Sequence, residues 1–398
     1  MLWDQYVYRR GNGVYELWED MFAARTVRPL YIGGRGFDVR SLHVLDAFVS
    51  SLQGAAAEIV DATLLLVGFD GYQLDDDIIK LTQVNADGMA KSFSRIGTTL
   101  ELPVGTGHDD GETTTTVALR DMAMEVLSKI DGATDVILDV SSLPRIVYLT
   151  LLTSILSHLV SKDPPIDNDT PHPLEARGVN FQVLVGEDAS LDAEIRAEDP
   201  SNTLVLIPGY SAVLQTESLL EWPLVWFPIL GENRINQLEK VLASGLIPDT
   251  AEVCPVLPQP SRDPRRADRL LVEYKTPLFE TGRTVIGNLL HAHESHPFEA
   301  YRQLLGAMRR YRKSMEMLGG VRLAVTPLGS KLITLGAGLA CFEMQPSGLN
   351  EGYGVGIPYA EPTRYVVSVD RLMQSSTPEI SALLLTGEAY SRGEVAIS

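Results

Sequence analysis

The sequence contains few cysteines and no long hydrophobic run. Its 398 residues include two cysteines, Cys254 and Cys341, and no Cys-x-x-Cys pair. A disulfide framework and a thiolate zinc site are therefore excluded, and such sparse cysteine is typical of a reducing compartment. No stretch reaches the roughly 18 uninterrupted apolar residues of a membrane span, and the N-terminus lacks the basic and apolar regions of a secretory signal. We expect a cytoplasmic protein that does not enter a membrane.

Positive charge is also scarce. The 33 Lys and Arg residues stand against 52 Asp and Glu residues, which gives a net charge of −19. This balance opposes binding to nucleic acid or to an anionic membrane surface. Basic residues still cluster at 262–269 and 309–313, which indicates either solvated helix faces or a surface for a protein partner. A small anionic ligand remains compatible with the composition, because local charge can differ from net charge.

Short apolar strands alternate with helical repeats along the chain. Strands are predicted at residues 29–32, 62–67, 98–104, 135–140, 180–185, 223–229, 251–256, 321–325, 354–358 and 363–367. This β-α alternation is typical of mostly parallel, doubly wound sheets. We predict an α/β protein with two Rossmann-like lobes, residues 1–215 and 216–398, and weak structural specification after residue 376.

Two short units recur in both halves. A strand, a glycine turn, an arginine and a helix occur at residues 31–42 and again at 226–238. A strand, a hydroxyl turn, a basic residue and an apolar helix begin at 138 and again at 323, which aligns Asp139 with Ala324. The shared order indicates an internal duplication. The alternative is that any two parallel α/β lobes produce such matches by chance.

All four turns follow predicted strands, at the edge where open parallel sheets bind ligands. Each turn opens a helix, so free backbone N–H groups and the positive end of the helix dipole lie together there. Nearby arginine and lysine add charge suited to phosphate or carboxylate. The candidate ligand-binding residues are Gly34, Gly36, Asp38, Arg40, Ser141, Ser142, Arg145, Arg234, Gly329, Ser330 and Lys331. The alternative for the glycines is a tight turn without a ligand.

Asp139 is the candidate catalytic residue. It lies near the end of an apolar strand, where a charge is costly unless it is paired or functional. In the functional interpretation it is an acid, a base or a metal ligand, with Ser142 on a phosphate. In the structural interpretation Asp139 fixes the turn, with Arg145 as a partner, and Ser142 caps the helix.

Common cofactor and catalytic motifs are missing. The sequence contains no G-x-G-x-x-G fingerprint, no Walker motif and no G-x-S-x-G elbow, so no cofactor is indicated. His293 and His296 are one residue short of the zinc spacing His-Glu-x-x-His, and a loop before a helix is the favoured interpretation. The acidic run 75–77 fits a helix N-terminus better than a metal site. We therefore predict no metal site.

The segment Asp139-Val-Ser-Ser-Leu-Pro-Arg145 resembles the ligand turn of CARF-type Rossmann sensor domains. Those domains bind cyclic oligonucleotides in prokaryotic defence, and their turn is usually rich in threonine and glycine, where this chain has Ser-Ser-Leu-Pro. The resemblance implies a nucleotide sensor as one function of the chain.

Three functions follow from these patterns. The leading hypothesis is a protein that binds a phosphorylated small molecule or nucleotide at the strand ends between its lobes, with hydrolysis or transfer left open. The second is a non-enzymatic sensor, or an assembly subunit of a prokaryotic defence complex with a protein partner. The third is a scaffold whose turns are only helix caps.

Overall fold

The structure is a computed structural model of the chain. It describes residues 1–105, 112–161, 172–188, 191, 195–200, 204–280, 282, 284–346, 354–373 and 377–391. Unit 1 comprises Met1–Thr106, Ala118–Arg196 and Tyr365–Ser398, and unit 2 comprises Gly107–Val117 and Ala197–Arg364. The expected single boundary at 215/216 therefore differs from the observed division, because the C-terminal segment returns to unit 1.

Unit 1 is built on a sheet of seven strands in the order β1-β19-β8-β7-β3-β5-β6. The strands are β1 (Val7–Arg10), β3 (Pro29–Gly34), β5 (Ala62–Phe69), β6 (Gly97–Val104), β7 (Asp135–Asp139), β8 (Asn180–Glu187) and β19 (Glu379–Thr386). The helices are α1 (Asn12–Phe22), α2 (Arg40–Gly54), α3 (Asp76–Phe93), α4 (Glu112–Ile130, in this unit from residue 118), α5 (Arg145–Leu159) and α12 (Val369–Met373). Two shorter strands, β2 (Thr26–Val27) and β4 (Glu58–Ile59), pair with each other, and the 3-10 turns are η1 (Pro173–Gly178) and η6 (Glu388–Tyr390).

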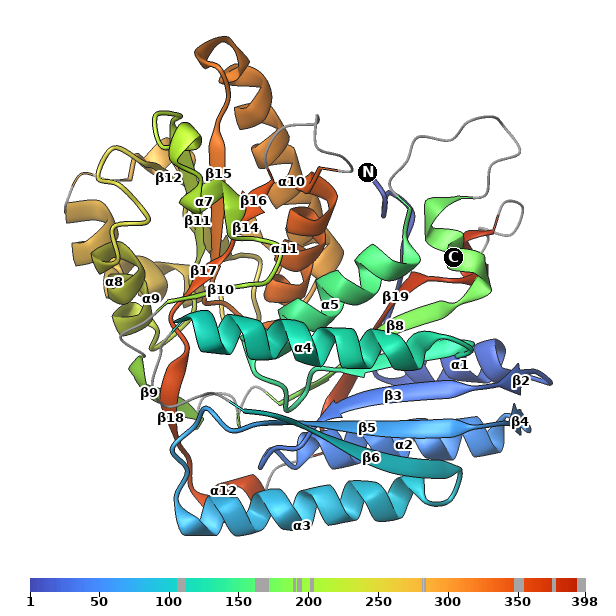
Figure 1. Cartoon of the computed structure of the whole chain (residues 1–398). Helices are drawn as coiled ribbons and strands as arrows, with labels where there is room; N and C mark the ends of the chain where they lie inside the picture. The colour runs from blue at the N-terminus through green and yellow to red at the C-terminus, as the bar shows by residue number, and fades with distance from the viewer. Residues whose placement is uncertain are drawn as a thin grey trace. The chain divides into compact units, whose positions relative to one another are not determined.

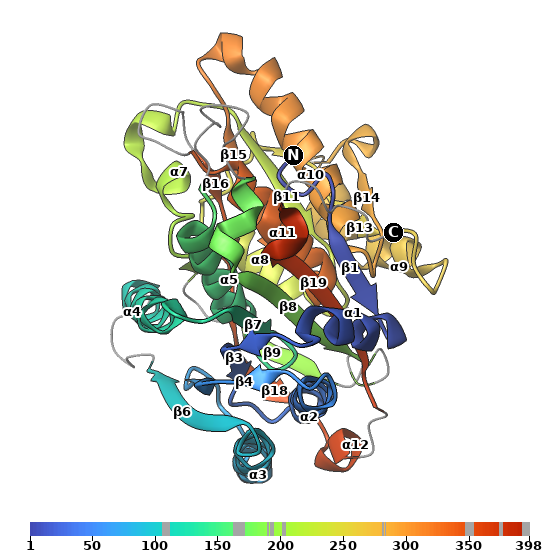
Figure 2. The same cartoon turned by 90° about the vertical axis from the view of Figure 1, so that its right-hand side faces the viewer.

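The central strands of unit 1 run parallel. β8, β7, β3, β5 and β6 pair in parallel, whereas β19 pairs antiparallel with both β8 and β1. The chain moves outward from β3 through β5 to β6 and then crosses to β7, so the strand order reverses between β3 and β7. Figures 1 and 2 show α2 and α3 on one face of this sheet and α4 and α5 on the other. Ligands bind at such a reversal point in open α/β sheets.

The prediction of weak structure after residue 376 is wrong for β19. This strand lies inside the sheet, and residues 380–385 are buried. Arg10 ties it to the neighbouring strands, since Arg10 Nη2 lies 2.7 Å from Glu379 Oε2 and 3.0 Å from Glu187 Oε2. A strand that is covered on both faces shows no alternation of apolar and polar residues, so its period alone does not identify it.

Unit 2 has a parallel sheet in the order β14-β13-β11-β15-β16, with β12 also pairing β11. The strands are β11 (Leu224–Ile229), β12 (Glu252–Val253), β13 (Val256–Pro258), β14 (Leu290–Ala292), β15 (Arg322–Pro327) and β16 (Val355–Gly356). The helices are α7 (Ala212–Gln215), α8 (Ile235–Ala243), α9 (Arg266–Glu273), α10 (Pro297–Ser314) and α11 (Lys331–Met344), and Figure 1 shows them on both sides of the strands. The single-turn segments are η2 (Glu217–Leu219), η3 (Lys275–Glu280), η4 (Ile286–Asn288) and η5 (Glu316–Leu318).

Short strand pairs complete the fold. β10 (Val205–Leu206) pairs with β17 (Pro358–Tyr359), and β9 (Arg196–Pro200) pairs with β18 (Pro362–Val366). β9 and β18 each contain a point at which the chain passes between the units, and α4 contains another. None of the helices in the described part of the chain combines the length and the hydropathy that a bilayer crossing requires.

The parallel cores of the two units share one strand order. β6-β5-β3-β7-β8 and β14-β13-β11-β15-β16 both follow the doubly wound order 3-2-1-4-5. The prediction of an α/β fold with mostly parallel sheets is confirmed. In unit 2 the order reverses between β11 and β15, the counterparts of β3 and β7.

A diagonal hydrogen bond also recurs between these central strands. The Tyr31 hydroxyl on β3 donates to Asp139 on β7 at 2.9 Å, and Trp226 Nε1 on β11 donates to the Thr326 hydroxyl on β15 at 2.9 Å. In both pairs the acceptor lies two residues beyond the residue that is directly opposite the donor. The structural counterpart of Asp139 is therefore Thr326, which corrects the predicted alignment with Ala324.

Candidate functional site

The turns after the two central strands of unit 1 are in contact. The Ser142 hydroxyl, after β7, donates a hydrogen bond to the Gly34 carbonyl oxygen of β3 at 3.0 Å. A Cβ at Gly34 would lie 2.6 Å from Ser142 Oγ, and a Cβ at Gly36 would lie 3.3 Å from Ser142 Cβ. The structure thus brings these three predicted residues together, and glycine is required at position 34 because the turns pack so closely.

Unit 2 has the same contact with different residues. A Cβ at Gly231 would lie 2.2 Å from the Leu328 carbonyl oxygen and 3.1 Å from Gly329 Cα. The buried Tyr274 hydroxyl donates to the Gly231 carbonyl oxygen at 2.7 Å and thereby holds the turn in place. Gly329, another predicted residue, therefore lies against the turn that follows β11.

The substitution Gly231→Ala tests this contact. We expect it to lower the free energy of unfolding by about 1–3 kcal/mol, since the added methyl group overlaps a backbone carbonyl that moves only with its strand. Gly287→Ala is the matched control, because a Cβ there meets nothing within 4 Å. Urea unfolding of both variants measures the difference. Equal stability of the two would show that the turns do not pack as described.

Asp38 and Arg40 form an ion pair with each other. Arg40 Nη2 lies 2.6 Å from Asp38 Oδ2, and the two side chains are 2% and 9% exposed. Arg40 Nε donates to the same carboxylate at 2.9 Å, and the Asn85 amide donates to the Asp38 carbonyl oxygen at 3.1 Å. The two charges neutralise one another inside the fold, which argues against the predicted role of Asp38 and Arg40 in binding an anion.

Asp139 and Ser141 anchor the turn that follows β7. The buried Asp139 carboxylate accepts hydrogen bonds from the Tyr31 hydroxyl and from the Ser141 backbone N–H, both at 2.9 Å. Ser141 Oγ accepts from the Gly186 N–H of β8 at 2.8 Å. Burial, together with the charge of Asp139, raises the pKa of Tyr31 well above its ordinary value. These contacts favour the structural interpretation of Asp139 over the catalytic one.

Replacing Tyr31 tests the structural role of Asp139. We expect Tyr31→Phe to cost about 1.5–3 kcal/mol of stability, because it removes a donor from a buried carboxylate. Tyr390→Phe is the control in the same unit: its buried hydroxyl donates to the neutral Leu384 carbonyl at 2.7 Å, and its loss should cost about 0.5–1.5 kcal/mol. The measurement is chemical denaturation. A smaller loss for Tyr31→Phe than for Tyr390→Phe would argue against an ionised, structural Asp139.

Basic residues begin the helices that follow the central strands. Arg145 is the first residue of α5, Lys331 is the first residue of α11, and Arg234 is the N-cap of α8. The first turns of these three helices contain no acidic residue. Among the helices that do not follow these strands, α3, α9, α10 and α12 carry acidic residues in their first turns, whereas α1 and α7 do not.

The positive end of a helix and a cation beside it repel each other by about 0.3–1 kcal/mol, and both of them attract an anion. The pattern occurs where the strand order reverses in each unit. Arg145, Arg234 and Lys331 thus lie at the sheet edge that the sequence predicts.

Arg234 has a second relevant feature. Its Nη1 atom is buried and has no hydrogen-bond partner within the described part of the chain. Burial raises the pKa of Tyr274, and the positive charge of Arg234 partly opposes this shift. Since the Tyr274 hydroxyl bonds to Gly231, the guanidinium lies close to the turn after β11. A buried donor without an acceptor is costly, which points to an acceptor supplied from outside.

Other polar groups of the turns after β11 and β15 are engaged within unit 2. Glu273 Oε1 accepts the Asn233 backbone N–H at 2.8 Å, so an internal carboxylate already satisfies that donor. Ser330 caps α11 by accepting the Ile333 N–H at 3.4 Å, and its hydroxyl donates to the Glu294 carbonyl oxygen at 3.3 Å. Ser330 therefore orients the start of α11.

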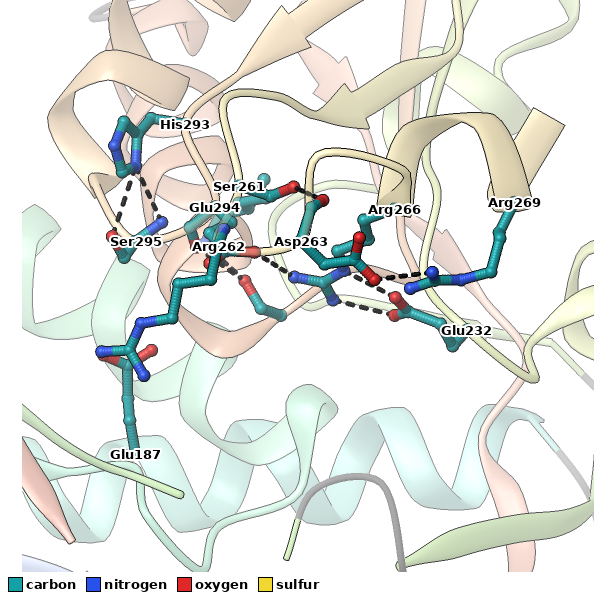
Figure 3. Close-up of polar contacts among 12 residues, drawn as sticks. Glu187, Glu232, Ser261, Arg262, Asp263, Arg266, Arg269, His293, Glu294 and Ser295 are labelled. Atoms are coloured by element: carbon teal, nitrogen blue, oxygen red, sulfur yellow. Dashed lines mark hydrogen bonds and ion pairs between the residues drawn. The ribbon is translucent and has the colours of Figure 1, made fainter. Parts of the chain in front are cut away.

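An ion-pair network that sequence reasoning missed holds the same edge of the unit 2 sheet (Figure 3). Arg266 Nε and Nη2 donate to the two carboxylate oxygens of Glu232 at 2.6 and 2.8 Å, and Arg266 Nη1 donates to Glu294 at 2.8 Å. Arg266 thereby joins the segments that follow β11, β13 and β14. Burial raises the pKa of Glu232, but the hydrogen bond and charge of Arg266 outweigh burial and hold it below its ordinary value.

The sequence contains one indication of this network, which is the position of its three residues just after strands. Glu232, Arg266 and Glu294 each follow a predicted or observed strand, but Arg266 belongs to the basic cluster 262–269 that was interpreted as a surface feature. The structural role of Arg266 is visible only in the folded chain, because its partners Glu232 and Glu294 are distant in the sequence.

The histidines near residue 293 act in local structure. His293 Nδ1 accepts the Ser295 N–H at 3.1 Å, and His296 Nδ1 caps α10 by accepting the Glu299 N–H at 3.2 Å. Burial lowers the pKa of His296, consistent with a neutral ring whose Nδ1 is an acceptor. His291 belongs to strand β14.

The His296 cap predicts a pH dependence of stability. The folded state binds this proton less readily than the unfolded chain, so the free energy of unfolding falls as the pH drops from above about 6.5 through the folded pKa. His296→Asn keeps an N-cap acceptor without a titrating group. We expect the loss of stability between pH 7.5 and pH 5.5 to be smaller in His296→Asn than in the parent protein. Unfolding curves at both pH values measure it, and an unchanged difference would contradict the capping role.

The likeness of this chain to solved structures is weak. A scan against protein-family models finds no match, and a search of curated proteins finds none either. The chain is similar to a solved structure of a candidate UDP-N-acetylglucosamine 2-epimerase from Listeria monocytogenes, at 12% identity and a TM-score of 0.23. The match covers 77% of this chain and 75% of that chain.

Proposed function

We propose that the protein binds a phosphorylated small molecule or nucleotide through unit 2, at the turns that follow β11 and β15. The observation that carries the proposal is the buried Arg234 Nη1, a donor with no hydrogen-bond partner within the described part of the chain. A phosphate oxygen would satisfy this donor and would complete a charge-assisted hydrogen bond.

Lys331 and the start of α11 would supply the second half of the site. The first backbone N–H groups of a helix have no acceptor within the helix, and the dipole favours an anion there. Gly231 and Gly329 allow the two turns to approach each other, which leaves backbone rather than side chains at the reversal point. An anion between Arg234 and Lys331 would thus meet charge from two separate segments.

Unit 1 offers a weaker version of this arrangement. Arg145 begins α5 beside Ser142, but Arg40 is neutralised by Asp38. The hydroxyl of Ser142 is also engaged with Gly34. We therefore assign the primary site to unit 2 and retain Ser142 and Arg145 as a predicted second anion position.

Binding without turnover is the second candidate function. It is favoured by the hydrogen bonds that the Asp139 carboxylate accepts from Tyr31 and Ser141, because they give this candidate catalytic group a structural role. A nucleotide sensor or an assembly subunit needs binding and a partner, but no catalytic group. Hydrolysis or transfer would need residues other than Asp139.

Calorimetric titration with pyrophosphate and with ADP tests the proposal. Arg234→Gln and Lys331→Gln should each weaken binding by about 10- to 100-fold, the value of one or two charge-assisted hydrogen bonds. Lys313→Gln is the matched control, because Lys313 is an exposed cation of α10 in the same unit. We expect the control to bind like the parent protein.

Two results would contradict the proposal. One is the absence of binding of either anion to the parent protein. The other is equal affinity of all three variants, which would place any bound anion elsewhere. A phosphate-release assay on the same samples separates the two candidate functions, since steady release would reject binding without turnover.

A further inference from the structure

A pocket separate from the proposed phosphate site lies in unit 2, near the starts of strands β13 and β14. Its volume is about 310 Å³, close to the lower end of the range of about 300–1,000 Å³ that is usual for ligand pockets. Cys254 precedes β13, Asn288 precedes β14, and Arg310, Tyr311 and Met315 come from the C-terminal end of α10. The turns of the phosphate site follow the strands, so this pocket lies toward the opposite edge of the sheet.

We propose that this pocket binds a small carboxylate with an apolar or aromatic body. The inference is independent of the phosphate site, and it rests on three features of the lining: a fixed hydrogen-bond chain, an uncompensated arginine and an apolar wall.

The hydrogen-bond chain sets the protonation of the lining. The Tyr311 hydroxyl lies 2.8 Å from Glu252 Oε1, and Asn288 Nδ2 donates to the same oxygen at 3.0 Å. A carboxylate only accepts, so the single proton of the Tyr311 hydroxyl is committed to Glu252. Cys254 Sγ, 3.3 Å from the same hydroxyl oxygen, must then be the donor to it.

The thiol is therefore a neutral part of the wall. Burial raises the pKa of Cys254 to about 11, in agreement with a protonated sulfur. A protonated thiol is neither a nucleophile nor a metal ligand at neutral pH. Glu252 itself is not among the residues that line the pocket, and its Oε1 atom is occupied by the two neutral donors Tyr311 and Asn288.

Arg310 gives the lining of the pocket a positive charge. Its side chain is exposed, and within the described residues it forms no ion pair or side-chain hydrogen bond. The neighbouring cations are engaged: Arg309 Nη2 lies 2.6 Å from Glu343 Oε1, and Arg312 Nη2 donates to the Met344 carbonyl oxygen at 3.1 Å. Arg310 thus presents a planar guanidinium, whose geometry matches a carboxylate, at a pocket whose lining contains no acidic residue.

The rest of the wall is apolar. Leu290, Ala307, Met315 and the ring of Tyr311 line the space beside Arg310. An apolar body would bury against these side chains, while the carboxylate meets the arginine. A methionine and a tyrosine suit a flat ring, because sulfur and aromatic contacts with a ring are favourable.

Calorimetric titration with benzoate and hexanoate tests the inference, with benzamide and hexanamide as neutral counterparts. We expect the carboxylates to bind the full-length protein and Arg310→Gln to weaken that binding by about 10-fold, the effect of one charged hydrogen bond. Lys313→Gln, an exposed cation of the same helix outside the pocket lining, should leave binding unchanged. The amides should respond to neither substitution.

Alkylation of Cys254 provides an independent readout. Cys254 lines the pocket, whereas Cys341 is fully buried, so mass spectrometry after iodoacetamide treatment at pH 9 can follow position 254. Bound benzoate should slow the modification of Cys254 in the parent protein and have less effect in Arg310→Gln. No binding by either carboxylate, equal binding to Arg310→Gln and Lys313→Gln, or unaltered alkylation at saturating benzoate would each overturn the proposal.

Discussion

The close approach of two turns at the middle of each parallel sheet is the constraint on which the structure depends. In unit 2 the backbone at Gly231 lies so near the Leu328 carbonyl that a methyl group would overlap it, and in unit 1 Gly34 and Ser142 are in the same relation. This contact fixes the register of the central strands at the point where the strand order reverses. It also sets where the following helices begin, because each helix starts within a few residues of its turn.

Charge compensation separates the structural ionic groups from the candidate ligand groups. Arg40 and Arg266 are both held by carboxylates with two or more hydrogen bonds, and their roles lie within the fold. Arg234 keeps a buried donor without an acceptor in the described chain, and Lys331 stands at the positive end of a helix without an acidic residue in its first turn. A buried donor without an acceptor is costly, so Arg234 Nη1 points to an acceptor supplied from outside the chain.

The sequence alone predicts an α/β fold with mostly parallel sheets, although it does not predict strands β1, β14 and β19. Strand periods, glycine turns and apolar helices depend on nearest neighbours, so the β-α alternation and the positions of the four turns follow from local pattern. β19 is not found by this reasoning, because seven of its eight residues are buried and it lies inside a sheet built mainly by the first half of the chain. The division into units is also not predicted, because the segment from Tyr365 onward returns to unit 1.

The site is only partly accessible to such reasoning. The basic residues at the helix starts are visible as a pattern, as are the glycines. Whether a cation is free or paired depends on contacts over long sequence separations, such as Arg266 with Glu232 and Glu294, or on local geometry, such as Arg40 with Asp38. The diagonal bonds from Tyr31 and Trp226 likewise appear only when the strands are placed side by side.

The most direct measurement is a crystal structure of the full-length protein with pyrophosphate bound. The account predicts a phosphoryl group within hydrogen-bond distance of both Arg234 Nη1 and the first N–H groups of α11, beside Lys331. Well-defined pyrophosphate at another position, with the buried Nη1 atom still lacking an acceptor, would contradict it.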